Sequence, residues 1–369
     1  MREIEPDAAQ QLREFFEELE SLVLSRKDPS TRVTYRPVDE NEVVDDSLPS
    51  DEETELIIES PSERIPTREF QSCAGGPVAA VDCGVGRLGE TEDGVIVALR
   101  ATVVVDSKNT SRVSYLRSGP IYLHNRYRAV ALYLMGKQLG KDDFFVELDK
   151  ADPDKPVPVR VKAGVADNVY QYGDRFRNWL ERVAQRIAVS SIENGTILFD
   201  GALTLGTRDT PATYLRDLAA LAGSRGNSII AISKRSQLQV GERPVRFWLD
   251  DSPHRACHRL LTPLLAGERG ERVLGNVYAV RFSPLGPTFR MDVKPASGQS
   301  DYEAINGLYN SAAMRGGYPD IQVRAHAHSY FTYPDIIQLQ AQAGARYGLT
   351  PQGEIELSGI FAPFGGRFK

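Results

Sequence analysis

Three runs rich in valine and isoleucine follow one another early in the chain, and they constrain the fold more than any other feature. They lie at Val78–Val81, Val95–Val105 and Ser111–Leu116, and short polar or glycine-containing segments separate them. β-branched residues favour strands, and short connections join antiparallel neighbours. The sequence therefore predicts an antiparallel meander of three strands.

The segment after the first run contains the spacing G-x-G-x-x-G, formed by Gly84, Gly86 and Gly89. A dinucleotide-binding turn needs a helix directly after these glycines. The next segment, Gly94–Asp106, is rich in Val and Ile and reads as a strand. We therefore expect the three glycines to form the turn of a hairpin, without a dinucleotide site.

Helices and strands alternate in the rest of the chain. Helices are predicted at 125–139, 167–191, 213–221, 302–314 and 321–330, and strands at 196–200, 228–234, 273–281 and 289–293. Strands first and interleaved helices later predict an α/β fold with a mixed sheet and flanking helices.

The first 70 residues differ in charge from the remainder. Residues 1–70 hold 20 Asp and Glu against 8 Lys and Arg, whereas residues 71–369 hold 30 against 36. Apolar residues recur at helical spacing over 8–24, which fits a helix packed on its own domain or one that meets a partner. Residues 39–59 are strongly acidic, so we expect them not to bind DNA. We divide the chain into an acidic N-terminal leader, 1–70, and a main domain, 71–369.

Composition favours a soluble, cytoplasmic protein. No run of 18 apolar residues is present, and the charged start of the chain does not resemble a signal peptide. The three cysteines are an odd, sparse set that suits a reducing compartment better than a disulfide framework.

Two predicted strands end in aspartate, VAAVD at Asp82 and TILFD at Asp200. Each aspartate alone fits a turn former. If the strands are neighbours, however, the two carboxylates converge, and their repulsion favours a bound Mg²⁺ or Mn²⁺. Such an ion could activate water beside a phosphodiester.

A third carboxylate, Glu181, lies on the long helix that leads into the strand of Asp200. It flanks the apolar stripe, with small alanines beside it, so it could approach the strand-end aspartates. A solvated glutamate paired with Arg177 is an equally good interpretation.

In this order, VAAVDCG, the helix with Glu181, ILFDGAL, IAISKRS and GYPDIQVRAHAHSYF resemble the NurA nuclease family over roughly residues 70–345. The resemblance implies a ribonuclease-H-like, Piwi-like core that cuts single-stranded DNA and DNA ends with Mn²⁺, or with Mg²⁺. It also implies a homodimer that works with a HerA-type hexameric ATPase in DNA end resection.

The same resemblance assigns roles to individual residues. Asp82, Glu181 and Asp200 would be the acidic catalytic metal ligands, and His326 would complete the site. Three residues would bind DNA: Lys234, near a phosphate, Arg235 beside it, and Tyr318. Tyr318 precedes the helix that carries His326.

Two histidines, His326 and His328, lie in the last predicted helix. Side chains two residues apart on a helix point about 200° apart, so both cannot face one site. We expect His326 to be the histidine that faces the site, as a metal ligand or as a proton carrier to the leaving oxygen.

Two other functional classes stay open. DCGVG and DGALTLG could be the phosphate-binding turns of an actin-like or sugar-kinase-like ATP-binding phosphotransferase, although the adenosine turn of that fold is missing. Alternatively, the aspartates could be turn formers in a non-catalytic DNA-binding scaffold. HRACH places His254, Cys257 and His258 at ligand-like spacing, but with no second pair of ligands we expect a partly exposed helical turn and no zinc site.

Overall fold

The computed structural model describes most of the main domain and parts of the leader. The described residues are 66–92, 94–108, 110–124, 171–206, 212–234, 236, 238–240, 243–250, 256–262 and 272–351, with Glu14, Glu17 and short strands at 33–37, 57–58, 146–148 and 158–161. Glu14 and Glu17 are helical. The rest of the predicted leader helix, the predicted helix at 125–139, Arg235 and His254 lie outside the described residues.

The predicted antiparallel meander is confirmed. It consists of β4 (Val78–Thr91), β5 (Gly94–Ser107) and β6 (Thr110–His124), paired in sequence order. The prediction that the triple glycine forms the hairpin turn is wrong, because all three glycines lie within β4. Gly86 is needed for packing: a Cβ atom there would lie 3.0 Å from the ring of Phe331.

Two more strands extend the sheet on the other side of β4. β9 (Thr196–Asp200) runs parallel to β4, and β10 (Ser228–Ser233) runs parallel to β9. Helix α3 (Tyr172–Ser191) precedes β9, and α4 (Ala212–Ser224) connects β9 to β10. The spatial order β6-β5-β4-β9-β10, with helices in these connections, is the arrangement of a ribonuclease-H-like fold. The predicted fold class is thus confirmed.

The sheet is extended in two places, beyond β10 and beside the C-terminal half of β4. Beyond β10 lie β15 (Phe289–Lys294), β14 (Asn276–Arg281), β13 (Cys257–Leu260) and β3 (Arg68–Glu69). At the far end of β4, β1 (Val33–Pro37) pairs with β4 and with β18 (Leu349–Pro351). Among the described residues, seven short strands form separate small sheets: β2 (Ile57–Ile58), β7 (Val146–Leu148), β8 (Pro158–Val161), β11 (Gln239–Val240), β12 (Arg243–Pro244), β16 (Met314–Arg315) and β17 (Tyr318–Pro319). A 3-10 helix, η4 (Val245–Phe247), follows β12. The leader therefore contributes strands to the sheet of the main domain.

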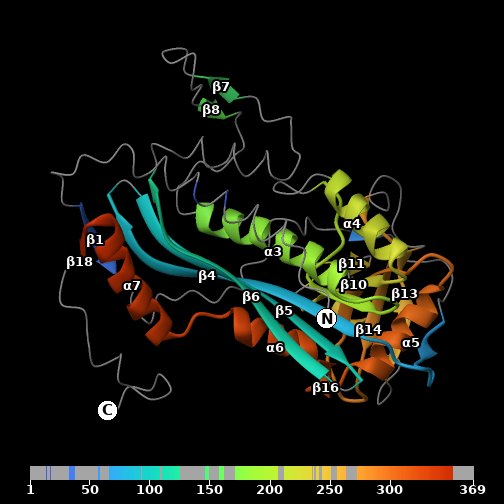
Figure 1. Ribbon diagram of the computed structural model, residues 1–369. Coiled ribbons are helices and arrows are strands. Elements are labelled where there is room, and N and C mark those ends of the chain that lie inside the picture. Colours follow the sequence, from blue (N-terminus) through green and yellow to red (C-terminus); the bar gives the residue numbers. More distant parts are fainter. Residues whose placement is uncertain are drawn as a thin grey trace.

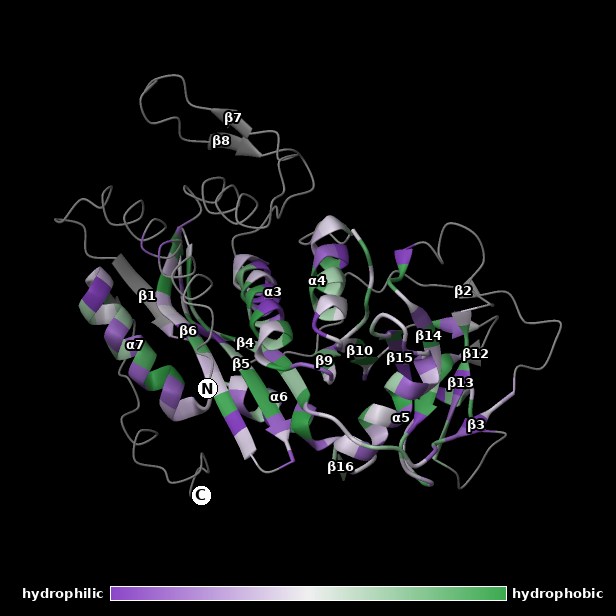
Figure 2. Ribbon diagram, turned by 45° about the vertical axis from the view of Figure 1, so that its right-hand side comes forward, coloured by the Kyte–Doolittle hydropathy of each residue, from purple (hydrophilic) through white to green (hydrophobic). Residues whose placement is uncertain are grey.

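Helices cover both faces of this sheet (Figure 1). α3 and α4 pack on one face, and α5 (Asp301–Ser311), α6 (Asp320–Ser329) and α7 (Tyr333–Tyr347) pack on the other. Because side chains alternate along a strand, Ala79, Val81 and Cys83 of β4 face α3, whereas Val78 and Ala80 face α5 and α6. The helices accordingly carry hydrophobic and hydrophilic residues on different sides (Figure 2). Asp82 follows the same alternation and faces α6.

None of the helices among the described residues is long and apolar enough to cross a lipid bilayer.

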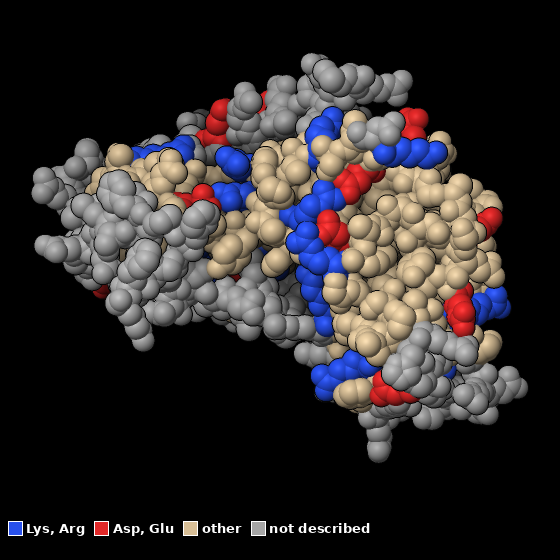
Figure 3. Space-filling view, turned by 90° about the horizontal axis from the view of Figure 1, so that it is seen from below, with Lys and Arg blue, Asp and Glu red and all other residues tan. Residues whose placement is uncertain are grey.

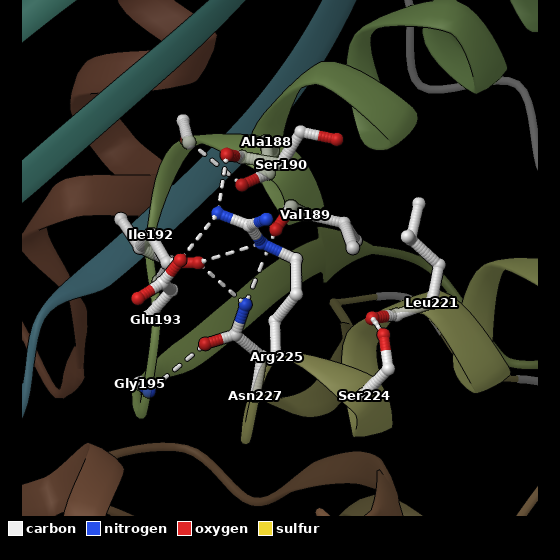
Figure 4. Close-up of polar contacts among 11 residues, drawn as sticks. Ala188, Val189, Ser190, Ile192, Glu193, Gly195, Leu221, Ser224, Arg225 and Asn227 are labelled. Carbon is white, nitrogen blue, oxygen red and sulfur yellow. Dashed lines mark hydrogen bonds and ion pairs between the residues drawn. The ribbon is translucent and has the colours of Figure 1, made fainter. Parts of the chain in front are cut away.

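The end of α3 is tied to the start of β10, which holds β9 between them (Figure 4). Asn227 donates from Nδ2 to the carbonyls of Ile192, at 2.8 Å, and Val189, at 3.2 Å, and its Oδ1 accepts from the amide of Gly195. Arg225 donates to the carbonyl of Ile192 as well. Carbonyls at the end of a helix have no partner within it, so these side chains satisfy groups that would otherwise be buried unpaired.

The expectation of a partly exposed helical turn at HRACH is wrong. Cys257 and His258 lie in β13 and are buried, because this strand pairs with β14 on one side and β3 on the other. The His258 ring lies 5.5 to 5.7 Å, centre to centre, from the rings of Phe70, Tyr278 and Tyr302. His258 is thus part of an aromatic cluster.

Candidate active site

The two aspartates predicted at strand ends lie side by side, but only Asp200 ends its strand, because β4 continues past Asp82 to Thr91. β4 and β9 are parallel neighbours with Val78 opposite Thr196 and Ala80 opposite Leu198. Two residues further along, the same register brings Asp82 beside Asp200, on strands about 4.8 Å apart. Both side chains point to the face covered by α6; Asp82 is buried, and the side chain of Asp200 is 27% exposed. The first two carboxylates predicted from the sequence are therefore brought together.

Beyond this point the chain turns away sharply after Asp200. Gly201 has a φ of 99°, in the region that strongly favours glycine, and its amide donates to the carbonyl of Ile232. The amide of Leu203 then donates to Oδ2 of Asp292, at 2.9 Å. Asp292 is fully buried and paired with Arg290. This buried pair anchors the turn that carries Asp200.

Asp82 accepts three hydrogen bonds. Oδ1 accepts from the amide of Cys83 at 2.9 Å, and Oδ2 lies 2.7 Å from Nδ1 of His326 and 3.1 Å from Oγ of Ser329. Burial alone would raise the pKa of Asp82, but the hydrogen bond and charge of His326, with the charge of Lys234, hold it below its usual value. Asp82 is therefore held as a carboxylate.

Asp200 has a different environment. Its Oδ2 lies 2.7 Å from Nζ of Lys234, which follows β10. Burial raises the pKa of Asp200 above its usual value, the charge of Asp82 adds to this, and Lys234 acts in the opposite direction. The repulsion between the two carboxylates is thus only partly neutralised by the side chains around them.

Tyr318 in β17 closes the site from another direction. Its ring centre lies 5.3 Å from Nζ of Lys234. Burial, followed by the charges of Asp200 and Asp82, raises the pKa of its phenol well above the usual value. Its buried hydroxyl has no hydrogen-bond partner among the described residues. A neutral donor is therefore held close to both carboxylates.

The two histidines of α6 point in different directions. His326 contacts Asp82, and its hydrogen bond to that carboxylate raises the pKa of the imidazole against the opposing effect of burial. His328 instead places Nδ1 2.8 Å from the hydroxyl of Tyr115 in β6. Only His326 therefore joins the aspartates.

Glu181 is not brought to the aspartates. It lies on α3, which packs on the opposite face of the sheet, and its Oε1 accepts from Nε2 of Gln185 at 3.2 Å. Its charge acts on Tyr214 of α4, whereas the largest effects on the pKa of Asp82 come from burial and His326, and those on the pKa of Asp200 from burial and Lys234. The role of Glu181 as a metal ligand stays a prediction, as does the role of Arg235, which lies outside the described residues.

The side chains around Asp82 and Asp200 suit a divalent metal ion. Within the described part of the chain, no three Asp, Glu, His or Cys side chains converge as a ready metal cage. Mg²⁺ and similar ions, however, commonly use one or two carboxylates together with water and substrate phosphate oxygens. Asp82 and Asp200 supply such a pair, and the unpartnered hydroxyl of Tyr318 leaves one donor for a further ligand. The residues present therefore fit the metal.

Lys and Arg side chains form a stripe on the face seen from below in Figure 1, and acidic side chains interrupt it (Figure 3). A polyanionic backbone gains most of its affinity from such side chains. Lys234, whose Nζ lies 2.7 Å from Oδ2 of Asp200, supplies such a cation beside the carboxylates.

Some residues of the site carried no signal in the sequence. Ser329 and Asp292 contact Asp82 and the turn after Asp200, but only the tertiary structure brings them there. The spacing of Ser329, three residues after His326 on one helix, could have suggested a shared face. Nothing in the sequence near Asp292 points to the site.

The phosphate-turn interpretation of DCGVG does not fit the structure. Gly84 and Gly86 continue β4 and pair with Arg100 and Ala98 of β5, so the segment forms no loop that could surround a phosphate. One of the two turns that the ATP-binding alternative needs is thus missing.

Comparison with known proteins gives likenesses of structure. No protein-family model matches the chain, and no curated protein matches it in sequence. The NurA nuclease from Sulfolobus solfataricus has a TM-score of 0.47 and 14% identity, covering 76% of this chain and 87% of that one. A NurA structure bound to dAMP and manganese has a TM-score of 0.40 and 9% identity, covering 72% and 87%. A. aeolicus Argonaute has a TM-score of 0.29 and 9% identity, covering 75% and 28%. These likenesses concern the fold, and the function has to be inferred from the side chains.

Proposed function

We propose that this protein is a metal-dependent deoxyribonuclease that cleaves single strands internally and degrades DNA from its ends. The observation that carries the proposal is a pair of carboxylates, the buried Asp82 within β4 and the partly buried Asp200 at the end of the parallel neighbour β9, with Lys234 and His326 against them. The ribonuclease-H-like strand order and the resemblance of the sequence motifs to NurA nucleases support the same conclusion.

In this proposal Asp82 and Asp200 hold a divalent ion, Mn²⁺ or Mg²⁺, which when bound lowers the pKa of water and neutralises charge on the phosphate. Lys234 exchanges its contact with Asp200 for a phosphate oxygen of the substrate. His326, whose raised pKa favours the imidazolium, donates a proton from its other ring nitrogen to the oxygen that leaves phosphorus. Tyr318 donates its hydroxyl hydrogen to a phosphate or water oxygen.

The test is cleavage of an end-labelled single-stranded oligonucleotide and of a duplex, with Mn²⁺, with Mg²⁺ and with EDTA. Cleavage in either metal and none in EDTA is expected. Asp82→Asn and Asp200→Asn should each lower the rate by several orders of magnitude, since metal activation lowers the pKa of water by roughly 8 units. Asp217→Asn, a matched change at an exposed position of α4, should cleave like the wild type.

Metal-independent binding without cleavage would instead favour the non-catalytic scaffold. Near-normal cleavage by Asp82→Asn or by Asp200→Asn would contradict a shared metal site. Circular dichroism of each variant establishes that the fold is retained.

The resemblance to NurA nucleases also leads us to propose a cytoplasmic homodimer that works with a HerA-type hexameric ATPase in end resection and DNA repair. Light scattering of the purified chain tests the dimer. Stimulation of duplex degradation by such an ATPase with ATP, against ATP withheld, tests the partnership.

A further inference from the structure

An exposed tyrosine lies in the same cross-strand row as the catalytic aspartate. Asp82 of β4 is opposite Thr102 of β5, and Thr102 is opposite Tyr115 of β6. Directly opposed residues of antiparallel strands point to the same face of the sheet. Tyr115 therefore lies on the face of Asp82, two strands and about 10 Å away.

Tyr115 is held in place although it is exposed. Forty per cent of the residue is accessible to solvent. Its hydroxyl lies 2.8 Å from Nδ1 of His328, and the two rings meet edge to face at 74°. An aromatic ring fixed at its hydroxyl loses little further conformational entropy when a ligand packs on it.

A cation accompanies this ring. The guanidinium of Arg117, two residues along β6 on the same face, lies 4.7 Å from the centre of the Tyr115 ring. Among the described residues Arg117 has no carboxylate partner, in contrast to Arg324 of α6, which pairs with Asp106 and Asp320. Arg117 is therefore available for a phosphate or a base.

The pair is linked to the site through a single helix. His328, which holds Tyr115, and His326, which contacts Asp82, are two residues apart on α6. The helix therefore fixes the distance between the exposed ring and the carboxylates.

We propose that Tyr115 and Arg117 form a subsite that stacks a base of single-stranded nucleic acid next to the nucleotide whose phosphate is cleaved. This rests on the proposed nuclease function. Proteins that bind single strands combine aromatic rings, on which any base can stack, with cations that follow the backbone. The subsite would hold an unpaired strand in register with the carboxylates, without selecting its sequence.

The test measures binding without cleavage. Fluorescence anisotropy in EDTA follows a labelled oligothymidylate and an oligonucleotide of the same length in which the central nucleotides are abasic. Tyr115→Ala should weaken binding of oligothymidylate about tenfold and leave the abasic strand unchanged, because stacking needs a base. Tyr115→Phe keeps the ring but loses the bond to His328, so it should weaken oligothymidylate binding by much less than Tyr115→Ala does.

Phe247 provides a matched control. It is 42% exposed, and the guanidinium of Arg246 lies 4.9 Å from its ring centre, so Phe247→Ala removes an equivalent aromatic–arginine pair away from the site. Its oligothymidylate affinity should equal that of the wild type. Unchanged binding by Tyr115→Ala, or an equal loss on the abasic strand, would overturn the proposal.

The outcome is separable from that of the nuclease proposal, because binding in EDTA does not depend on cleavage. A base-dependent loss in Tyr115→Ala, with no cleavage by the wild type in any metal, would retain the subsite and remove the nuclease. Metal-dependent cleavage by the wild type with unchanged binding by Tyr115→Ala would retain the nuclease and remove the subsite.

Discussion

Nζ of Lys234 lies 2.7 Å from Oδ2 of Asp200, so an ammonium occupies the carboxylate that we assign to the metal ion. The charge of the same ammonium also lowers the pKa of Asp82, and Nζ lies 5.3 Å from the centre of the Tyr318 ring. Lys234 therefore stabilises the pair of carboxylates, and in the proposed mechanism it would compete with a divalent ion for Asp200.

Replacing Lys234 by methionine should separate these two effects. Without the ammonium, Mn²⁺ should bind several-fold more tightly, because nothing competes for Asp200, while cleavage should fall at least tenfold because a phosphate contact is lost. Isothermal titration calorimetry with Mn²⁺ and the oligonucleotide assay measure the two quantities. Weaker Mn²⁺ binding in Lys234→Met would show that the ammonium is not a competitor.

His326 and His328 should differ sharply as alanine variants. His326→Ala removes both the hydrogen bond to Asp82 and the proposed proton donor, and proton transfer by a positioned side chain contributes roughly 100-fold or more to a rate. We expect its single-turnover rate of cleavage in Mn²⁺ to fall at least tenfold. His328→Ala removes only the contact with Tyr115, so its single-turnover rate at saturating DNA should stay within about threefold. The opposite ranking would mean that the proton comes from the other face of α6.

The local sequence was sufficient for the elements but not for their partners. Val- and Ile-rich runs and helical spacing located β4, β5, β9 and β10 and the helices between them. Helical spacing reports burial of one face of a helix, and continuous apolar runs report strands buried on both faces. The two aspartates could be recognised as a pair because each follows a short apolar run, although β4 continues beyond Asp82. That they are neighbours required the parallel pairing of β4 with β9, across more than one hundred residues.

The misjudged segments depend on distant residues. Gly86 reads as a turn, but it pairs with Ala98 of β5, and Phe331 of the C-terminal region lies where a side chain would project. Cys257 and His258 read as a helical turn, but pairing with Arg68 and Glu69 of β3 makes them a buried strand. Turn and helix propensities describe neighbours in sequence, whereas these positions are determined by tertiary contacts.

Asn227 should be important for stability. Its side chain bonds two carbonyls at the end of α3 and the amide of Gly195, and it is 1% exposed. Asn227→Ala would remove the side-chain partner of the Val189 carbonyl and of the Gly195 amide, while the Ile192 carbonyl would keep its bond from Arg225; each unsatisfied buried group costs about 1–3 kcal/mol. We expect urea denaturation to show a loss of about 2–4 kcal/mol in the free energy of unfolding. Ser224→Ala, an exposed change whose hydroxyl bonds the carbonyl of Leu221, should lose less than about 1 kcal/mol. Equal losses in the two variants would contradict the role of Asn227.

His258 should make the fold sensitive to acid. Burial, with a contribution from the charge of Arg68, lowers its pKa to about 4, whereas an unfolded histidine titrates near about 6.5. Between these values the unfolded chain binds a proton that the folded chain excludes. The stabilisation is therefore complete above about pH 6.5 and is lost as the pH falls towards 4, to a maximum of the order of 3 kcal/mol. His326, whose pKa is raised, contributes with the opposite sign, being lost as the pH rises. The comparison that isolates His258 is thus the wild type against His258→Phe, by urea denaturation between pH 7 and pH 5. The free energy of unfolding of the wild type should fall more steeply towards acid pH than that of His258→Phe. Parallel curves would show that His258 is not kept neutral by the aromatic cluster.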